Sequence, residues 1–221
     1  EPVRLTLNTD SGDLSESDYG SIPTSAPERS HNALLTNFRE DSEQSLINTI
    51  RHANAVLDSW PEHRYAPSSA YLAGWASLWV DAQPAAHRAM KDFAAWRAYI
   101  GALITASSYF ERAGAYDAGA DSFWTTSSSE PLALIHEGFV EPMALARFLG
   151  VQRVLKIGYL ETPDFDTLQR AILALEEIEK EYPTWSRNHG LGTSIRRLVA
   201  AATVEEDRRR RADEIFGGKD G

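Results

Sequence analysis

Apolar and polar residues alternate along most of the chain with the period of an α-helix. The clearest example is a stripe at positions i, i+4, i+7, i+11 and i+14, formed by Leu46, Ile50, Ala53, Leu57 and Trp60. Residues at this spacing share one face of a helix, and an apolar face packs against the rest of the protein. Asp41 or Ser42 can cap such a helix at its start, and Pro61 stops it. The pattern therefore predicts an amphipathic helix between residues 42 and 60.

The same kind of pattern recurs through the rest of the chain. Residues 71–80 are apolar on nearly every side, which indicates a central buried helix. Pro84 suits the first turn of a long helix that runs to about Arg112. Residues 125–129 are expected to form a loop, and the last helix either runs straight through Thr203 or breaks there. The remaining expected helices lie at 116–124, 131–137, 142–149, 151–160, 166–181 and 194–215.

The first thirty residues differ from the rest. Residues 3–7 alternate apolar and polar side chains, the period of a short strand, and residues 8–30 are rich in Ser, Asp, Pro and Gly. We therefore expect an all-α protein: an irregular multi-helix bundle of about 8–9 helices with an extended N-terminal tail. The predicted domains are the polar tail (1–30), an aromatic-rich helical domain (31–130) and a second helical domain (131–221).

Composition narrows the classes of protein to which the chain can belong. Hydrophobic residues make up 43% of the 221 positions, enough to bury a core, and the formal net charge is −10. There is no cysteine, which excludes disulfide frameworks and thiolate chemistry and favours a cytoplasmic location. The longest apolar run, residues 71–80, is too short to cross a bilayer, so no membrane partner is expected. Arg outnumbers Lys 18 to 4, a bias typical of GC-rich bacterial genomes.

Residues 143–153 carry the most specific local motif. Leu145, Leu149 and Val151 are spaced to pack two helices together, and Gly150 can supply the positive φ of a tight turn between them. This arrangement resembles the helix-turn-helix of many bacterial transcription regulators, over the segment 143–160.

The helix-turn-helix resemblance implies a recognition helix in the major groove of DNA. Its implied nucleic-acid-binding residues are Arg147, Gln152, Arg153 and Lys156. The pattern departs from the motif at Lys156, where the second helix normally buries a branched aliphatic residue. A plain helical hairpin has the same glycine and the same small residue where the helices cross, here Ala146, and it is the alternative interpretation.

Aromatic residues are concentrated in the middle of the chain. Thirteen of the 22 lie between Trp60 and Trp124. Large rings with polar edges can line a ligand pocket within residues 71–124, and the candidate pocket residues are Trp75, Trp79, Trp96, Arg97 and Tyr109. His87 and Glu111 are further polar anchors for such a ligand. The alternative is that these rings form the core between stacked helices.

The sequence contains no recognisable catalytic or metal-binding motif. The six histidines are scattered, and the single Glu-x-x-His pair, Glu28 and His31, lacks the second copy that a di-iron bundle needs. Arginines 208–211 form a basic run, but acidic residues flank it at helical spacing, which predicts an ion-paired surface helix. We expect no catalytic residue, no metal and no cofactor.

These patterns favour a non-enzymatic regulatory or interaction protein. Its expected partner is another protein or a second copy of the chain, and nucleic acid is a further candidate through residues 143–160. Two alternatives stay open: a small helical enzyme or ligand-binding protein that uses the aromatic pocket, and a structural subunit of a larger complex.

Overall fold

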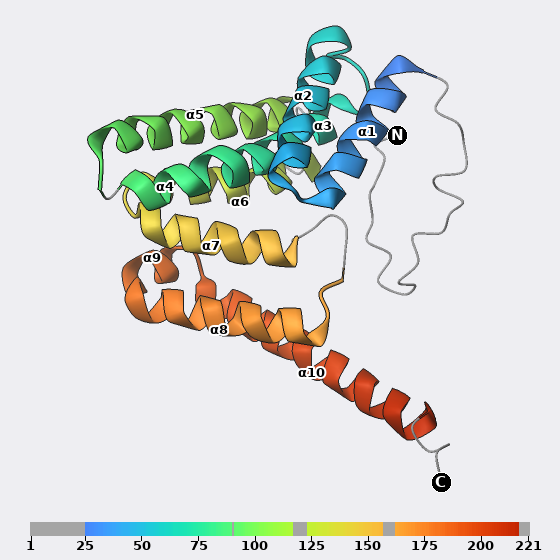
Figure 1. Cartoon of the computed structure of the whole chain (residues 1–221), viewed down its shortest axis with the longest axis vertical. Helices are drawn as coiled ribbons and strands as arrows, with labels where there is room; N and C mark the ends of the chain where they lie inside the picture. The colour runs from blue at the N-terminus through green and yellow to red at the C-terminus, as the bar shows by residue number, and fades with distance from the viewer. Residues whose placement is uncertain (1–24, 90, 117–122, 157–161, 217–221) are drawn as a thin grey trace. The chain divides into compact units, whose positions relative to one another are not determined.

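The computed structural model describes residues 25–89, 91–116, 123–156 and 162–216. These residues form ten α-helices and one π-helical turn, with no strand among them, which confirms the predicted all-α class (Figure 1). The chain divides into two compact units, residues 1–146 and 147–221. We call them unit 1 and unit 2. The strand predicted at residues 3–7 lies outside the described residues.

Two capped helices open unit 1. Helix α1 (Ala26–Glu40) begins inside the predicted polar tail, because the Ser25 side chain and the Glu28 carboxylate form a reciprocal capping box. Helix α2 (Glu43–Ser59) is capped by Ser42, as its pattern predicted. Residues 26–30, which the sequence placed in the polar tail, lie in the first turns of α1.

A long helical stretch follows without a break. Helix α3 (Ala66–Ser77), the π-helical turn η2 (Leu78–Ala82) and α4 (Gln83–Ala89) are continuous, so the described residues hold nine separate helical segments. The prediction that Pro84 starts a new helix is wrong. A proline ring clashes with the carbonyl four residues earlier, and the wider π turn just before Pro84 relieves that clash.

The long central helix of unit 1 starts nine residues later than expected. Helix α5 (Phe93–Ala115) is capped by Asp92, whose side chain accepts a hydrogen bond from the Ala94 amide at 2.9 Å. It packs against α3, α4 and α6 (Phe123–Gly138), while α2 packs on α1 and α3 (Figure 1). Residues 125–129 belong to α6 rather than to the predicted loop.

The core of unit 1 lies between α3, α5 and α6. Gly74 of α3 approaches the Phe110 ring so closely that a Cβ there would sit 2.7 Å from a ring carbon. The buried Tyr99 hydroxyl of α5 donates to the Gly138 carbonyl at the end of α6, 2.6 Å away. These contacts hold α5 with its opposite face outward.

Helix α7 (Pro142–Leu155) runs across the division between the two units, which falls between Ala146 and Arg147. The position between residues 130 and 131, where the sequence predicted a domain boundary, lies inside α6. Helix α7 continues through Gly150 without interruption.

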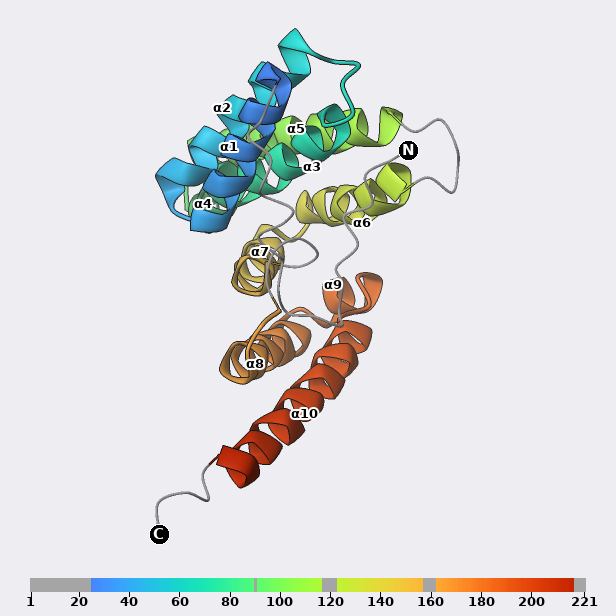
Figure 2. The same ribbon diagram turned by 90° about the vertical axis from the view of Figure 1, so that its right-hand side faces the viewer.

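Unit 2 also contains α8 (Phe165–Glu181), α9 (Pro183–Asn188) and α10 (Leu191–Phe216), and both α8 and α9 pack on α10 (Figure 2). Gly190, at φ +62°, makes the turn into α10. Helix α10 does not break at Thr203. The Thr203 hydroxyl donates to the Val199 carbonyl of the preceding turn at 3.0 Å, a bond that a continuous helix accommodates. No helix within the described ranges is both long and apolar enough to cross a membrane.

Candidate functional site

An open groove lies between α7 and α8 of unit 2. Its volume is about 330 Å³. It is lined by Arg147, Gly150, Val151 and Val154 from α7 and by Arg170, Ala171, Ala174, Glu177 and Ile178 from α8. On α7 these positions follow the i, i+3, i+4, i+7 pattern of one helix face, so two facing stripes make the walls.

Small side chains keep this groove open. Gly150 on one wall and Ala171 and Ala174 on the other leave space that larger residues would fill. Val151 and Ile178 are buried, whereas Val154 at the rim is 53% exposed. An exposed valine beside an apolar hollow offers a surface that gains from contact with another apolar side chain.

Charged groups stand around the rim of the groove. At one end the Arg147 guanidinium contacts the Glu181 carboxylate at 2.6 Å. Hydrogen bonding to Glu181 raises the pKa of Arg147, so its positive charge is retained. Arg170 is exposed, and it donates within its own helix to the Asp166 carbonyl at 3.3 Å and the Thr167 hydroxyl at 3.5 Å. Glu177 also lines the groove. The groove therefore combines an apolar floor with a rim of mixed charge, in which Arg147 is paired with Glu181 and, among the described residues, Arg170 bonds only within its own helix.

The predicted helix-turn-helix is not present in the described part of α7. Gly150 lies inside one continuous helix, so the turn expected at this position is wrong. The helix tolerates a glycine there at a cost of about 1 kcal/mol relative to alanine, which packing offsets. The left-handed residue of this segment is Lys156, at φ +45°. Residues 157–161 of the expected recognition helix lie outside the described residues.

The four residues predicted to contact DNA have different environments. The Gln152 side chain is buried, with 5% of its surface exposed, and Arg147 is paired with Glu181. Arg153 is half-buried, and Lys156 follows the last turn of α7. They do not form one exposed recognition surface.

The five residues of the predicted aromatic pocket are divided between core and surface. Trp75 and Trp79 are buried in unit 1, with ring centroids 5.7 Å apart. The Tyr109 hydroxyl donates to Asn54 Oδ1 at 2.8 Å and ties α5 to α2. Trp96 and Arg97 lie on the surface, where they line an open pocket of about 490 Å³ together with Phe93 and Ile100. The core interpretation therefore holds for Trp75 and Trp79.

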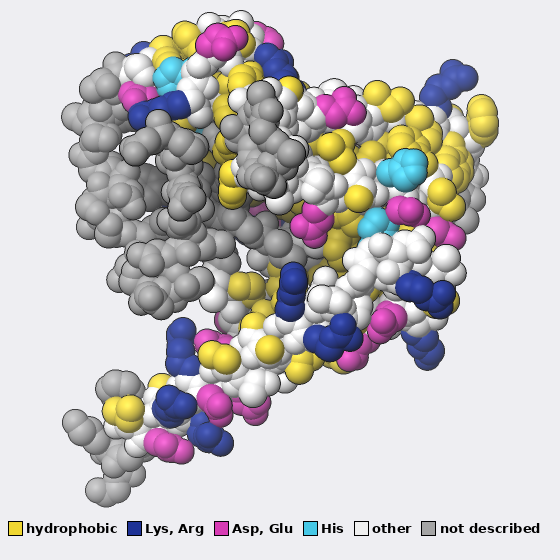
Figure 3. Space-filling view, turned by 180° about the vertical axis from the view of Figure 1, so that it is seen from behind, with side chains coloured by type: hydrophobic (Ala, Val, Ile, Leu, Met, Phe, Trp, Pro, Cys, Tyr) yellow, Lys and Arg dark blue, Asp and Glu magenta, His cyan; other side chains and the backbone are white. Residues whose placement is uncertain are grey.

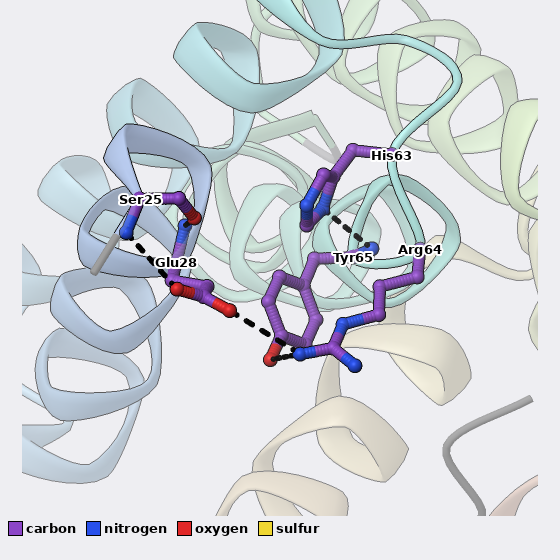
Figure 4. Close-up of polar contacts among 5 residues, drawn as sticks. All are labelled: Ser25, Glu28, His63, Arg64 and Tyr65. Carbon is purple, nitrogen blue, oxygen red and sulfur yellow. Dashed lines mark hydrogen bonds and ion pairs between the residues drawn. The ribbon is translucent and has the colours of Figure 1, made fainter. Parts of the chain in front are cut away.

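A polar cluster joins the start of α1 to the connection between α2 and α3 (Figure 4). Arg64 contacts the Glu28 carboxylate at 3.3 Å and donates to the Tyr65 hydroxyl at 2.9 Å. Tyr65 stacks on the His31 ring at 4.4 Å, and His31 Nδ1 lies 3.2 Å from the Ser69 hydroxyl.

The Ser69–His31 contact has the residue types of a nucleophile and a base. Both side chains are buried, and burial lowers the pKa of His31 to about 4. A substrate cannot approach a hydroxyl with no exposed surface, so the contact serves to join α1 to α3.

The predicted ion-paired surface helix is confirmed on α10, where Arg208 and Arg209 contact Glu205, and Arg210 contacts Asp207. Basic and acidic side chains lie beside one another on this helix (Figure 3). Within the described residues, no three His, Asp or Glu side chains lie close enough to share a metal ion.

Sequence reasoning missed the groove. Its signal was the small residues Gly150, Ala171 and Ala174 on otherwise apolar helix faces, which were interpreted as a turn and as ordinary helix positions. No protein-family model matches the chain, and no curated protein or solved structure is significantly similar to it.

Proposed function

We propose that this chain is a non-enzymatic interaction protein that binds a helical segment of a partner protein in the groove between α7 and α8. The observation that carries the proposal is the open apolar hollow with Val154 exposed at its rim. An amphipathic helix laid into a groove buries a few anchor side chains at i, i+3 or i+4, and i+7. The small residues on the α7 and α8 walls of the groove leave space for the anchor side chains of such a helix.

One side chain at the rim, Arg170, favours an acidic residue in the partner segment. Arg147 is already paired with Glu181, and Glu177 also lines the groove, so the preference for an acidic residue depends on Arg170. The long hydrogen bonds of Arg170 within α8 can be exchanged for a carboxylate of the partner. Unit 2 has thirteen Lys and Arg and thirteen Asp and Glu, so the excess of negative charge belongs to unit 1. An acidic helix is therefore repelled less by unit 2 than by the remainder of the chain.

A pair of synthetic peptides tests the proposal. The probe is a fluorescein-labelled model helix with leucines at i, i+3, i+4 and i+7 and glutamates beside them, and its twin carries lysines. We expect the glutamate peptide to bind the full chain more tightly, despite the net charge of −10. Fluorescence anisotropy measures both affinities.

A variant that fills the groove tests the same binding from the side of the protein. Ala174→Phe is expected to weaken the glutamate peptide by about tenfold or more, because the added ring occupies the space of an anchor side chain. Ala200→Phe, at an exposed position on α10, is the control and should leave binding unchanged. No binding of the peptide, or equal binding to Ala174→Phe, contradicts the proposal.

The biological setting is proposed from composition. The absence of cysteine favours the cytoplasm as the location of this interaction protein, and the arginine bias favours a bacterial source. DNA binding through Arg147, Gln152, Arg153 and Lys156 stays a prediction, without the turn on which it was based.

A further inference from the structure

The middle of the outward face of α5 lacks the charged residues that normally cover a solvated helix. Residues 98–110 contain no Asp, Glu, Lys or Arg. One side of this stretch is the buried face with Tyr99, Leu103 and Phe110. The opposite side is exposed, and Ile104 there has 57% of its surface open to solvent. At the start of α5, Phe93 is 81% exposed.

The exposed face has a regular order of small and large residues. Positions spaced alternately by three and four residues form what we call the outer seam: Ala94, Arg97, Gly101, Ile104, Ser108 and Glu111. This is the spacing by which two helices interlock side chains along their length. Small and large residues alternate along the seam, and its two charges, of opposite sign, lie toward its ends.

We infer that the outer seam binds the outer seam of a second copy of this chain, with the two α5 helices antiparallel. When the twofold axis passes midway between Gly101 and Ile104, every large residue faces a small one. Ile104 then lies opposite Gly101 of the other copy. By the same symmetry Arg97 lies opposite Ser108, and Glu111 lies opposite Ala94.

The space at Gly101 fits this pairing. A Cβ built on Gly101 has no heavy atom within 4 Å, so nothing in the described part of the same chain fills the position. A glycine lets two helix backbones approach closely and leaves a hole for the Ile104 side chain of the second copy. A glycine inside a helix costs about 1 kcal/mol relative to alanine, a cost that close packing of a second helix offsets.

The charges select the antiparallel direction. In the antiparallel register, Arg97 of one copy and Glu111 of the other are three residues apart along the axis, about 4.5 Å of rise. Their long side chains span that offset, and the symmetry forms the contact twice. A parallel pair would instead place Arg97 against Arg97 and Glu111 against Glu111, which is repulsive.

The contact extends past the seam at both ends of the dimer. Phe93, Trp96, Arg97 and Ile100 surround the open pocket of about 490 Å³ beside the seam. In the antiparallel pair this pocket faces the region around Ser108 of the other copy, which is small and uncharged. The exposed rings at the start of α5 would thereby be covered together with Ile104.

Sedimentation equilibrium of the full chain tests the inference. We expect a mass of two chains at about 100 µM protein. Gly101→Leu fills the hole without a clash inside the chain, and it is expected to raise the dimer dissociation constant about a hundredfold or more. A monomer mass at this concentration, or a dimer indifferent to Gly101→Leu, overturns the inference. Circular dichroism checks that the variant is folded.

Charge reversal tests the pairing of the two ends. Arg97→Glu and Glu111→Arg should each raise the dissociation constant about tenfold, because two attractive contacts become repulsive. The double variant restores opposite charges and should return the constant close to the original value. If the loss of dimerisation free energy in the double variant equals the sum of the losses in the two single variants, the antiparallel register is overturned.

Cross-linking gives the direction of the helices independently. The chain has no cysteine, so a single introduced thiol reports only on its own position. Ile104→Cys lies close to the axis and should form a disulfide with its own copy on oxidation. Ala94→Cys lies seventeen residues from its counterpart, about 25 Å, and should not. Cross-linking of Ala94→Cys as fast as Ile104→Cys would mean parallel helices and overturn the inference.

Discussion

The Arg147 guanidinium lies 2.6 Å from the Glu181 carboxylate and joins α7 to the end of α8 at one end of the groove. Both side chains are partly exposed, so water and salt screen the pair. Glu181→Gln is therefore expected to lower the free energy of unfolding by less than about 1 kcal/mol, and by less still in about 1 M salt. Urea unfolding of this variant, with Glu176→Gln on the same helix as control, measures the effect. A loss above about 2 kcal/mol that persists in salt would contradict it.

Two glycines of unit 1 should respond in opposite ways to alanine. Gly74→Ala places a methyl group against the buried Phe110 ring and should cost about 1–3 kcal/mol through overpacking. Gly101→Ala meets nothing within 4 Å and should stabilise the monomer by about 0.5–1 kcal/mol through helix propensity. Urea unfolding at low protein concentration, where self-association is absent, compares them. Equal effects of the two changes would mean that α3 and α5 are not packed closely.

The hydroxyl of Tyr99 should stabilise unit 1 more than that of Tyr109. Tyr99→Phe leaves the buried Gly138 carbonyl without its donor at 2.6 Å, and we expect a loss of about 1–3 kcal/mol. Tyr109→Phe removes a bond to Asn54 in a half-buried position, for which about 0.5–1.5 kcal/mol is expected. Thermal and urea unfolding rank the two variants. The reverse order would contradict the burial of the α5–α6 contact.

Acid should weaken unit 1 through His31. Burial, with a smaller contribution from His63, lowers the pKa of His31 to about 4. The unfolded chain binds the proton near its ordinary pKa of about 6.5, so stability falls as the pH drops from about 6.5 toward 4. The full loss attributable to this group is about 3 kcal/mol.

His31→Phe isolates this contribution. It keeps a ring stacked on Tyr65 and cannot titrate. Its unfolding free energy should therefore fall less steeply with acid than that of the original chain, and identical pH slopes would contradict a buried neutral His31. Carboxylate titration is common to both proteins and cancels in the comparison.

The helices whose ends carry chemical signals could be predicted from sequence. Ser42 marks the start of α2 because its hydroxyl accepts a hydrogen bond from a backbone N–H of the first turn. Pro61 marks the end because proline has no backbone N–H to continue the helix. The start of α5 was not predicted: Asp92 caps it, whereas the prediction placed the start at Pro84. A π turn that carries a helix through a proline has no local sequence signature, so this part could not be predicted.

The candidate site was less accessible to sequence reasoning. A glycine such as Gly150 can occupy either a turn or the interior of a helix, and the sequence does not distinguish the two, because tertiary packing decides between them. Ala171 and Ala174 are ordinary helix residues until the facing wall is known. The outer seam of α5 was not predicted, because its exposure depends on which face Tyr99 and Phe110 bury.

A substitution at the rim of the groove tests peptide binding with less effect on folding than one in its floor. Val154→Asp introduces a carboxylate at an exposed position, so it should change stability little and weaken the glutamate peptide about tenfold. Val204→Asp on α10 is the matched control, because it adds the same charge at another exposed valine. Equal weakening by both would indicate that net charge, and not the groove, governs binding.

The location of the bound peptide tests the proposed function most directly. Titration of the glutamate peptide into isotopically labelled full chain, followed by backbone amide chemical shifts, reports which residues it touches. We predict saturable shifts concentrated at residues 147–154 of α7 and 170–178 of α8, the two walls of the groove. Shifts confined to α5, or absent from both walls at saturation, would contradict the assignment of this groove as the partner-binding site.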